Sequence, residues 1–221
     1  MGLSFEEQQE LLQQIKSIGI IPVIAISDAK KAVPLAKALL RGGIACIEIT
    51  FRTDEAEESI RRIADEVPEM LITAGTILTI EQLFAAKRAG AKLFISPGFN
   101  REIVKVCILN HFLHIPGCSN PTDMEASIEL KKTTVKFFPA EQAGGLAYIK
   151  ACAAVYTKLN FIPTGGINAR NLATYLEFDR VIACGGSWIA TKEMIDAENF
   201  DEITRLSKEA VEIVKSVRSK S

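Results

Sequence analysis

The sequence predicts an α/β protein in which eight parallel strands close into a single (β/α)8 TIM barrel, with an additional helix at the N-terminus. Short runs of β-branched and aromatic residues alternate with amphipathic stretches along the whole chain, which is typical of a parallel sheet. Eight such units occur within 221 residues, and eight is the number that closes a barrel. A hydrophobic fraction of 48% provides for a substantial core. A doubly wound open sheet is the main alternative.

An amphipathic stretch over residues 5–17 predicts the additional N-terminal helix. Eight β-like runs follow, at residues 20–26, 46–50, 71–75, 93–96, 113–116, 135–139, 161–165 and 181–185. Helical stretches separate them, among them residues 54–67, 79–90, 100–110 and 145–156, and residues 198–217 form the closing helix. No linker or low-complexity stretch interrupts this pattern, so we expect one domain over residues 1–221.

Composition and charge exclude several classes of partner. A formal net charge of −1 disfavours nucleic acid, because no basic excess is available to neutralise phosphates. No segment approaches the ~20 apolar residues needed to span a bilayer, so we expect no membrane partner. The five cysteines are scattered without a CxxC pair, and the first residues show no signal-peptide pattern. We therefore expect reduced thiols and a cytoplasmic location.

Unusual residues fall where the predicted strands end, which is where a barrel of this class builds its active site. In the run 46–50 and the two residues after it, the alternation of a strand places Glu48 and Arg52 on the face that also holds Cys46 and Thr50. The apolar residues between them face the other way, toward the helices. A structural Glu–Arg pair at the barrel mouth is the alternative to a functional pair.

Lys136 lies within the apolar run 135–139, and a lysine is expensive to bury there. Phe138 shares its face. Desolvation and a nearby cation such as Arg52 would favour the free amine, and Schiff-base formation with a carbonyl is the chemistry that such an amine does best. The alternative is a lysine whose stem is buried and whose charged end reaches solvent.

Two glycine pairs follow the last two predicted strands, in the segments "IPTGGIN" (162–168) and "ACGGSW" (183–188). Loops at this place often bind a phosphate through backbone N–H groups, and glycines permit the close approach that this requires. Ser187 adds a hydroxyl. Thr76 follows a glycine at the end of the third run, and Pro97 turns the chain after the fourth.

Six segments in colinear order resemble the 2-keto-3-deoxy-6-phosphogluconate (KDPG) and 4-hydroxy-2-oxoglutarate (KHG) aldolases, which are class I enzymes. They read "IEITFRT", "TAGT", "SPGF", "VKFFPAE", "PTGGIN" and "GGSW", and the resemblance runs from about residue 15 to residue 200. Two segments depart from the family pattern: "NPTD" (120–123) stands where relatives often read TPTE, and "LKKTT" (130–134) lacks the glycine usual before the sixth strand. These departures put substrate range in doubt more than reaction type.

The resemblance implies the roles of individual residues. Lys136 would form the Schiff base and Glu48 would carry protons. Arg52 and Thr76 would hold the pyruvate portion of the substrate, to which we also assign Pro97 and Phe138. The residues expected at the substrate phosphate are Gly165, Gly166, Gly186 and Ser187. Thr164, which lies between the imine and the phosphate loops, is expected to contact the aldehyde end and to influence stereochemistry.

The function expected from this resemblance is cleavage of KDPG to pyruvate and glyceraldehyde 3-phosphate by a homotrimer. Aldolases for the galactonate epimer or for 4-hydroxy-2-oxoglutarate remain alternatives, and decarboxylation of oxaloacetate is a plausible side activity. An isomerase or epimerase of sugar phosphates, or a non-catalytic sensor, would keep the glycine loops without needing the amine. We expect no cofactor and no metal, because the only two histidines, His111 and His114, lack an accompanying acidic cluster.

Overall fold

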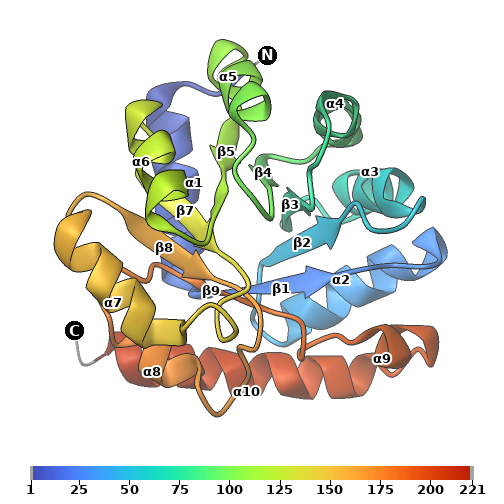
Figure 1. Cartoon of the computed structure of the whole chain (residues 1–221). Coiled ribbons are helices and arrows are strands. Elements are labelled where there is room, and N and C mark those ends of the chain that lie inside the picture. The colour runs from blue at the N-terminus through green and yellow to red at the C-terminus, as the bar shows by residue number, and fades with distance from the viewer. Residues whose placement is uncertain (1, 220–221) are drawn as a thin grey trace.

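The computed structural model of the chain describes residues 2–219, and residues 1, 220 and 221 of the expected domain lie outside the described part. Strands alternate with helices over most of the chain (Figure 1). The strands are β1 (Ile20–Ile24), β2 (Cys46–Thr50), β3 (Leu71–Gly75), β4 (Leu93–Ile95), β5 (Leu113–Ile115), β6 (Gly117–Cys118), β7 (Thr134–Phe137), β8 (Asn160–Pro163) and β9 (Cys184–Gly186).

The helices cover the strands on the outside (Figure 1). They are α1 (Phe5–Ile18), the 3-10 helix η1 (Ala29–Lys31), α2 (Ala32–Arg41), α3 (Ala56–Glu66), α4 (Ile80–Ala89), α5 (Arg101–Leu109), α6 (Pro121–Glu129), α7 (Gly145–Val155), α8 (Leu172–Leu176), α9 (Lys192–Asp196) and α10 (Phe200–Arg218). The expected N-terminal helix over residues 5–17 is confirmed as α1, and its start is fixed by a capping box between Ser4 and Glu7.

The predicted closed barrel of eight strands is wrong. All pairings are parallel, as expected, but the ladder divides into a six-stranded sheet in the order β5-β4-β3-β2-β1-β9 and a three-stranded sheet in the order β6-β7-β8. Between β8 and β9 only isolated bridges occur, Phe161 to Val181 and Thr164 to Gly185. The structure is therefore a six-stranded half-barrel beside a smaller sheet.

The division between the two sheets lies within the fifth predicted strand, at Pro116. A proline has no N–H to donate, so it interrupts a ladder. Before it, β5 pairs with β4; after it, β6 pairs with β7. Gly117 permits this change of partner, because a Cβ at this position would lie 2.2 Å from the Pro97 carbonyl. The strand predicted over residues 113–116 therefore belongs to the six-stranded sheet, and the residues that follow it, Gly117–Cys118, belong to the three-stranded sheet.

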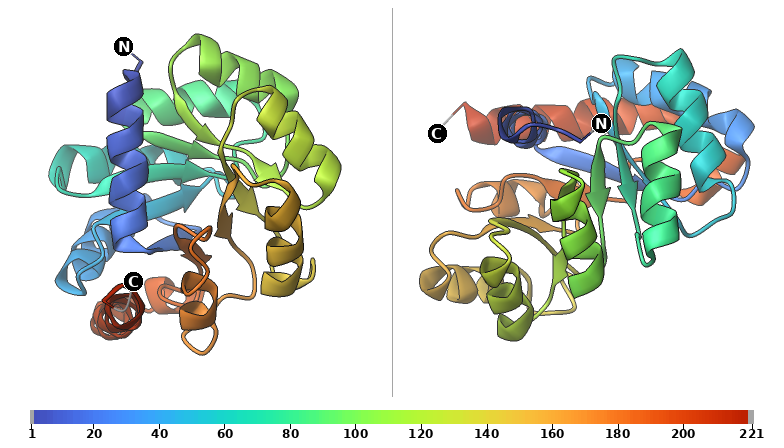
Figure 2. Two further views of the ribbon diagram at one scale, coloured as in Figure 1. Left: turned by 90° about the vertical axis from the view of Figure 1, so that its left-hand side faces the viewer. Right: turned by 90° about the horizontal axis from the view of Figure 1, so that it is seen from above.

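Two helices, α1 and α10, cover the N-terminal ends of the strands and one side of the molecule, respectively. Helix α1 lies across the N-terminal ends of the strands, as the left view of Figure 2 shows, and its Ile15 is fully buried. Helix α10 packs against α2 and α8. The carboxyl ends of the strands are left for loops, which is where a site on parallel strands forms. None of the helices within residues 2–219 combines the length and the apolar character required to cross a membrane.

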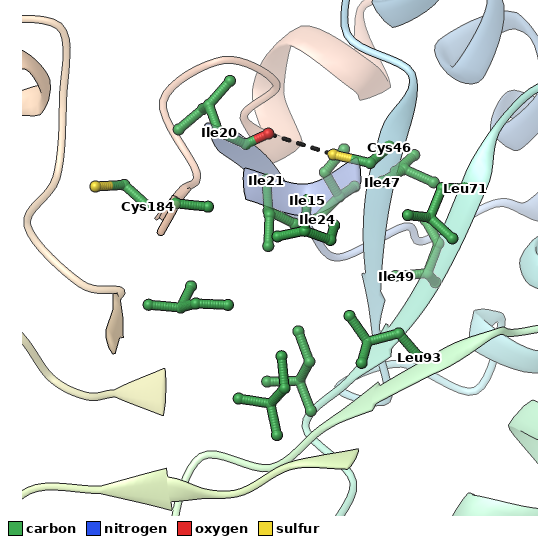
Figure 3. Close-up of a cluster of buried hydrophobic side chains, with 14 of the residues drawn as sticks. Ile15, Ile20, Ile21, Ile24, Cys46, Ile47, Ile49, Leu71, Leu93 and Cys184 are labelled. Carbon is green, nitrogen blue, oxygen red and sulfur yellow. Dashed lines mark hydrogen bonds between the residues drawn. The ribbon is translucent and has the colours of Figure 1, made fainter. Parts of the chain in front are cut away.

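One contiguous apolar core joins the strands to the helices. Figure 3 shows part of it, where Ile20, Ile21 and Ile24 of β1 pack near Ile47 of β2. The Cys46 thiol donates to the Ile20 carbonyl at 3.3 Å. Burial, reinforced by the neighbouring Glu48 carboxylate, raises the pKa of this thiol, so it stays protonated and unreactive.

Truncation of a side chain in this core should destabilise the fold strongly. Ile47 is fully buried, so Ile47→Ala should lower the free energy of unfolding by about 2–5 kcal/mol through lost burial and a residual cavity. Leu109 is 78% exposed, and Leu109→Ala should change that free energy by no more than about 0.5 kcal/mol. Urea unfolding of both variants measures the difference, and equal losses would contradict the described packing.

Candidate active site

A buried ion pair joins the two sheets. The Lys136 ammonium on β7 donates to Glu48 Oε1 on β2 at 3.1 Å. Both side chains are almost inaccessible, at 5% and 2% exposure. A buried charge of this kind is tolerated only with a partner of opposite sign, and here each group is that partner for the other. The sequence alternation that directed Glu48 away from the helices agrees with this geometry.

Gly75, at the end of β3, provides the space that the Glu48 carboxylate occupies. A Cβ at position 75 would lie 2.0 Å from Glu48 Oε1, which is far inside van der Waals contact. Glu48 pairs in register with Thr73, so Gly75 lies one inward-facing position farther along the neighbouring strand. The glycine of "TAGT" is therefore required beside Glu48 for steric reasons.

Arg52 follows β2 and is held by the last residue of that strand. Its Nε donates to the Thr50 hydroxyl at 2.9 Å. That hydroxyl in turn donates to the Ile24 carbonyl at 2.8 Å, which fixes its orientation. The Nε contact leaves the two terminal nitrogens of the guanidinium for a second partner, and a planar fork of this kind fits a carboxylate in bidentate fashion.

These groups meet at a cavity of about 290 Å³ at the carboxyl ends of the strands. Its lining consists of Val23, Thr50, Arg52, Thr76, Pro97, Lys136, Phe138, Thr164, Gly165, Gly166, Ile167, Gly185 and Ser187. The cavity thus brings together nine of the eleven residues expected from the sequence. The other two, Glu48 and Gly186, do not line it: Glu48 lies behind Lys136, and Gly186 packs against the ring of Trp188.

Thr76 follows β3 and Phe138 follows β7, and both line the cavity that holds the amine. Thr76 has a φ of 56°, the left-handed region, which costs a β-branched residue on the order of 1–3 kcal/mol. Strain of this kind is characteristic of functional positions. Lys136 Nζ lies 5.7 Å from the centroid of the Phe138 ring, so an aromatic face covers one side of the amine.

The two glycine segments at the ends of β8 and β9 contribute Gly165, Gly166, Gly185 and Ser187 to the lining of the cavity. Gly165 and Gly166 have φ values of 101° and 80°, a conformation that suits glycine. Gly185 makes room for Thr164, because a Cβ there would lie 2.2 Å from the Thr164 hydroxyl. That hydroxyl is buried and has no partner within residues 2–219.

Several contributions to the site were not identified from the sequence. Gly185, rather than Gly186, lines the cavity, and Val23 and Ile167 form apolar walls. The glycine pair indicated that this loop lies close to a bound group, but it did not indicate which of the two glycines lines the cavity. Thr50 was placed on the correct face, yet its bond to the Ile24 carbonyl depends on the neighbouring strand β1.

The histidines lie away from this cavity. His111 follows α5, and His114 lies in β5, where Nε2 contacts the Ser96 hydroxyl at 2.9 Å. Since that hydroxyl already donates to the Ile77 carbonyl, His114 carries its proton on Nε2. Burial lowers the pKa of His114 to about 3, so the ring is neutral. Residues 2–219 contain no group of three or more His, Cys, Asp or Glu side chains suited to a metal ion.

The close fit of Gly75 against Glu48 generates a paired prediction. Gly75→Ala should lower the free energy of unfolding by about 1–3 kcal/mol, since the new methyl overlaps a buried carboxylate. Gly98→Ala, also at a strand end, meets nothing within 4 Å and should change it by less than about 0.5 kcal/mol. Thermal unfolding of both variants distinguishes them, and a crystal structure of Gly75→Ala should show the carboxylate displaced from Lys136.

Known proteins are similar to this chain in sequence. Residues 11–206 match the family described as KDPG and KHG aldolase. A 2-dehydro-3-deoxy-phosphogluconate aldolase of Haemophilus influenzae is 42% identical, over 94% of this chain and 98% of that protein. A KHG/KDPG aldolase of Escherichia coli K12 is 39% identical, over 87% of this chain and 91% of that protein.

Solved structures agree with the sequence matches. The 2-keto-3-deoxy-6-phosphogluconate aldolase of Zymomonas mobilis superimposes with a TM-score of 0.87 and 35% identity, over 93% of this chain and 98% of that one. The KDPG aldolase of Legionella pneumophila, solved with pyruvate captured as a covalent carbinolamine, gives a TM-score of 0.87 and 36% identity, over 90% and 97% of the two chains. The chain belongs to the KDPG and KHG aldolase family.

Proposed function

We propose that this chain is a class I aldolase that cleaves 2-keto-3-deoxy-6-phosphogluconate to pyruvate and D-glyceraldehyde 3-phosphate. The observation that carries the proposal is the Lys136–Glu48 contact of 3.1 Å at the base of a cavity that also holds a guanidinium. A nucleophilic amine, a proton carrier and an anion-binding group are the parts that Schiff-base cleavage of a keto acid requires. The names and titles of the relatives support the substrate.

Imine formation begins with transfer of a proton from Lys136 to Glu48, its direct neighbour. The free amine then attacks the ketone carbon at C2 of the substrate and forms a carbinolamine. Loss of water gives an iminium ion that is covalently joined to Nζ. Glu48 supplies the proton that leaves with this water. The Phe138 ring, 5.7 Å from Nζ, lies close enough to stabilise the positive charge of the iminium.

Cleavage uses the iminium as an electron sink. Glu48, either directly or through one water, takes the proton of the C4 hydroxyl, the C3–C4 bond breaks, and the aldehyde departs. The electron pair of that bond forms an enamine of pyruvate on Lys136. Protonation at C3 by Glu48 regenerates an iminium, and addition of water releases pyruvate and the free lysine. One water is lost and one is consumed, so the cycle is balanced.

The two ends of the substrate differ in charge distribution and in their binding groups. Arg52, with Nε fixed by Thr50, holds the carboxylate next to the ketone. Thr76 and Pro97 contact the pyruvate portion beside it. The phosphate lies at the loops of Gly165 and Gly166 and at Ser187, which line the same cavity as Arg52. Gly186, which packs against Trp188, acts here only by shaping its loop.

The aldehyde end decides the substrate range. Thr164, which lines the cavity together with Lys136 and the glycine loops, contacts the C4 region and influences stereochemistry. 4-Hydroxy-2-oxoglutarate, whose second carboxylate would take the place of the phosphate, is a second substrate. Its cleavage would give pyruvate and glyoxylate. The name of the Escherichia coli relative supports this breadth.

The chain acts, in this proposal, as a single domain within a cytoplasmic homotrimer and needs no metal or other cofactor. One contiguous core over the described residues supports a single domain. The trimer and the location are supported only by the resemblance to the family and by the scattered cysteines. All five of these are buried and free.

The covalent step has a direct test. Wild-type protein treated with pyruvate and borohydride should gain the mass of one reduced pyruvate on Lys136, found by peptide mass spectrometry. Lys136→Ala should give no adduct and no pyruvate release, while Lys37→Ala, on an exposed part of α2, should retain both. An adduct on another side chain would overturn the mechanism, and an isomerase or a sensor would give no adduct.

The proton carrier has a separate test. Glu48→Gln keeps the shape but cannot accept a proton, so pyruvate release should slow by about 10² to 10⁴, with partial retention of borohydride trapping. Glu10→Gln, exposed on α1, is the matched control and should be unaffected. A lactate-dehydrogenase-coupled assay measures the rates. Complete loss of trapping in Glu48→Gln would show that Glu48 is needed to form the imine and not only to break the carbon bond.

A further inference from the structure

A second and larger cavity lies at the N-terminal ends of the strands, remote from the active-site mouth. Its volume is about 750 Å³, within the usual range for small-molecule sites. All six residues of the segment Glu129–Thr134 line it. That segment contains "LKKTT", the departure from the family pattern that the aldolase chemistry does not use.

The cavity exists because the two sheets separate here. Strand β5 pairs only with β4 on one side, and β7 pairs with β6 and β8, so β5 and β7 are not joined in a ladder. Leu113 and Thr134 face the cavity from these two strands. Helix α1, which crosses the N-terminal ends of the strands in the left view of Figure 2, contributes Leu12 to the lining. The helix and the two strands that border the cavity are therefore far apart in the chain.

The walls are mainly apolar, and the charged side chains of the lining that lack an ion-pair partner in the described part of the chain are lysines. Phe5, Leu12 and Ile108 supply hydrocarbon surface. Glu129 is the only carboxylate of the lining, and Arg101 neutralises it through two hydrogen bonds of 3.2 and 2.9 Å. Neither Lys131 nor Lys132 has a carboxylate partner within residues 2–219.

Both lysines are held at some cost. Lys131 has a φ of 57°, the left-handed region in which glycine is favoured and a side chain with a Cβ is strained. Lys132 is half-buried, and this burial lowers its pKa, because the charged ammonium loses solvation without gaining a counter-ion. An anion in the cavity would supply that counter-ion.

We propose that this cavity binds a small amphipathic carboxylate, whose hydrocarbon body lies against Leu12 and Ile108 and whose carboxylate pairs with Lys132, with Lys131 at the rim. Charge complementarity selects an anion, and the apolar walls select a hydrocarbon body. The site is separate from the active site, although Thr134 and Lys136 lie on the same face of β7, two residues apart. The proposal does not depend on the aldolase chemistry.

Octanoate is the probe, and octan-1-ol is its neutral counterpart of equal chain length. Isothermal titration of the full chain should show octanoate binding at least about tenfold tighter than octanol. Methyl NMR signals of Leu12, Ile108 and Leu130 should shift on titration, whereas those of Val23 and Ile167 at the active site should not. Lys132→Met, which keeps the hydrocarbon stem, should remove the preference for octanoate, and Lys37→Met, at an exposed position of α2, should preserve it.

A second variant tests the strained lysine without risk to folding. Lys131→Gly should raise the thermal unfolding midpoint, because glycine adopts the left-handed conformation freely, and should weaken octanoate binding at the same time. Equal affinity for octanoate and octanol, or shifts confined to Val23 and Ile167, would overturn the proposal. So would Leu12 and Ile108 signals that respond to protein dilution and not to octanoate, because a second copy of the chain would then be the occupant.

Discussion

The buried contact between Lys136 and Glu48 is the constraint on which the site depends. Removing two charges from water costs several kcal/mol for each, and only mutual attraction in a fixed geometry offsets this. The two residues are 88 positions apart and lie on different sheets. Their contact therefore requires that both sheets, and the helices that pack them, are in place. Gly75 follows from the same constraint, since any side chain there would occupy the position of the carboxylate.

Other residues of the cavity are positioned by single hydrogen bonds and by glycines that leave space for a neighbouring side chain. The Thr50 hydroxyl accepts a hydrogen bond from Arg52 Nε, which leaves the two terminal nitrogens of the guanidinium for an anion. Gly185 gives space to Thr164 in the same way that Gly75 gives space to Glu48. In the two glycine cases, a residue in or directly after one strand has space because the neighbouring strand carries no side chain at the adjacent position. Parallel strands in register make such support possible, because inward-facing positions of neighbouring strands lie side by side.

The break at Pro116 affects both ends of the molecule. Toward the carboxyl ends, it lets β6 pair with the strand that carries Lys136. Toward the N-terminal ends, it leaves β5 and β7 unjoined and opens the cavity under α1. Thr76, which lines the active-site cavity, and Lys131, which lines the second cavity, both have left-handed backbone. For Lys131 this is the common end of a helix, because it follows α6 as His111 follows α5, with the same backbone hydrogen bonds.

The sequence by itself predicted the alternation of parallel strands with helices, the inward face shared by Glu48 and Arg52, an unusual lysine at position 136 within an apolar run, and the family. These features are local: they follow from the period of apolar residues and from the chemistry of side chains that are unusual in their surroundings. The tertiary structure alone decided that the ladder divides into two sheets, that Lys136 meets Glu48, that Gly185 rather than Gly186 lines the cavity, and that "LKKTT" borders a second one. Whether a ladder continues depends on which backbone groups meet across neighbouring strands. That is set by the packing of residues far apart in the chain, which no local period records.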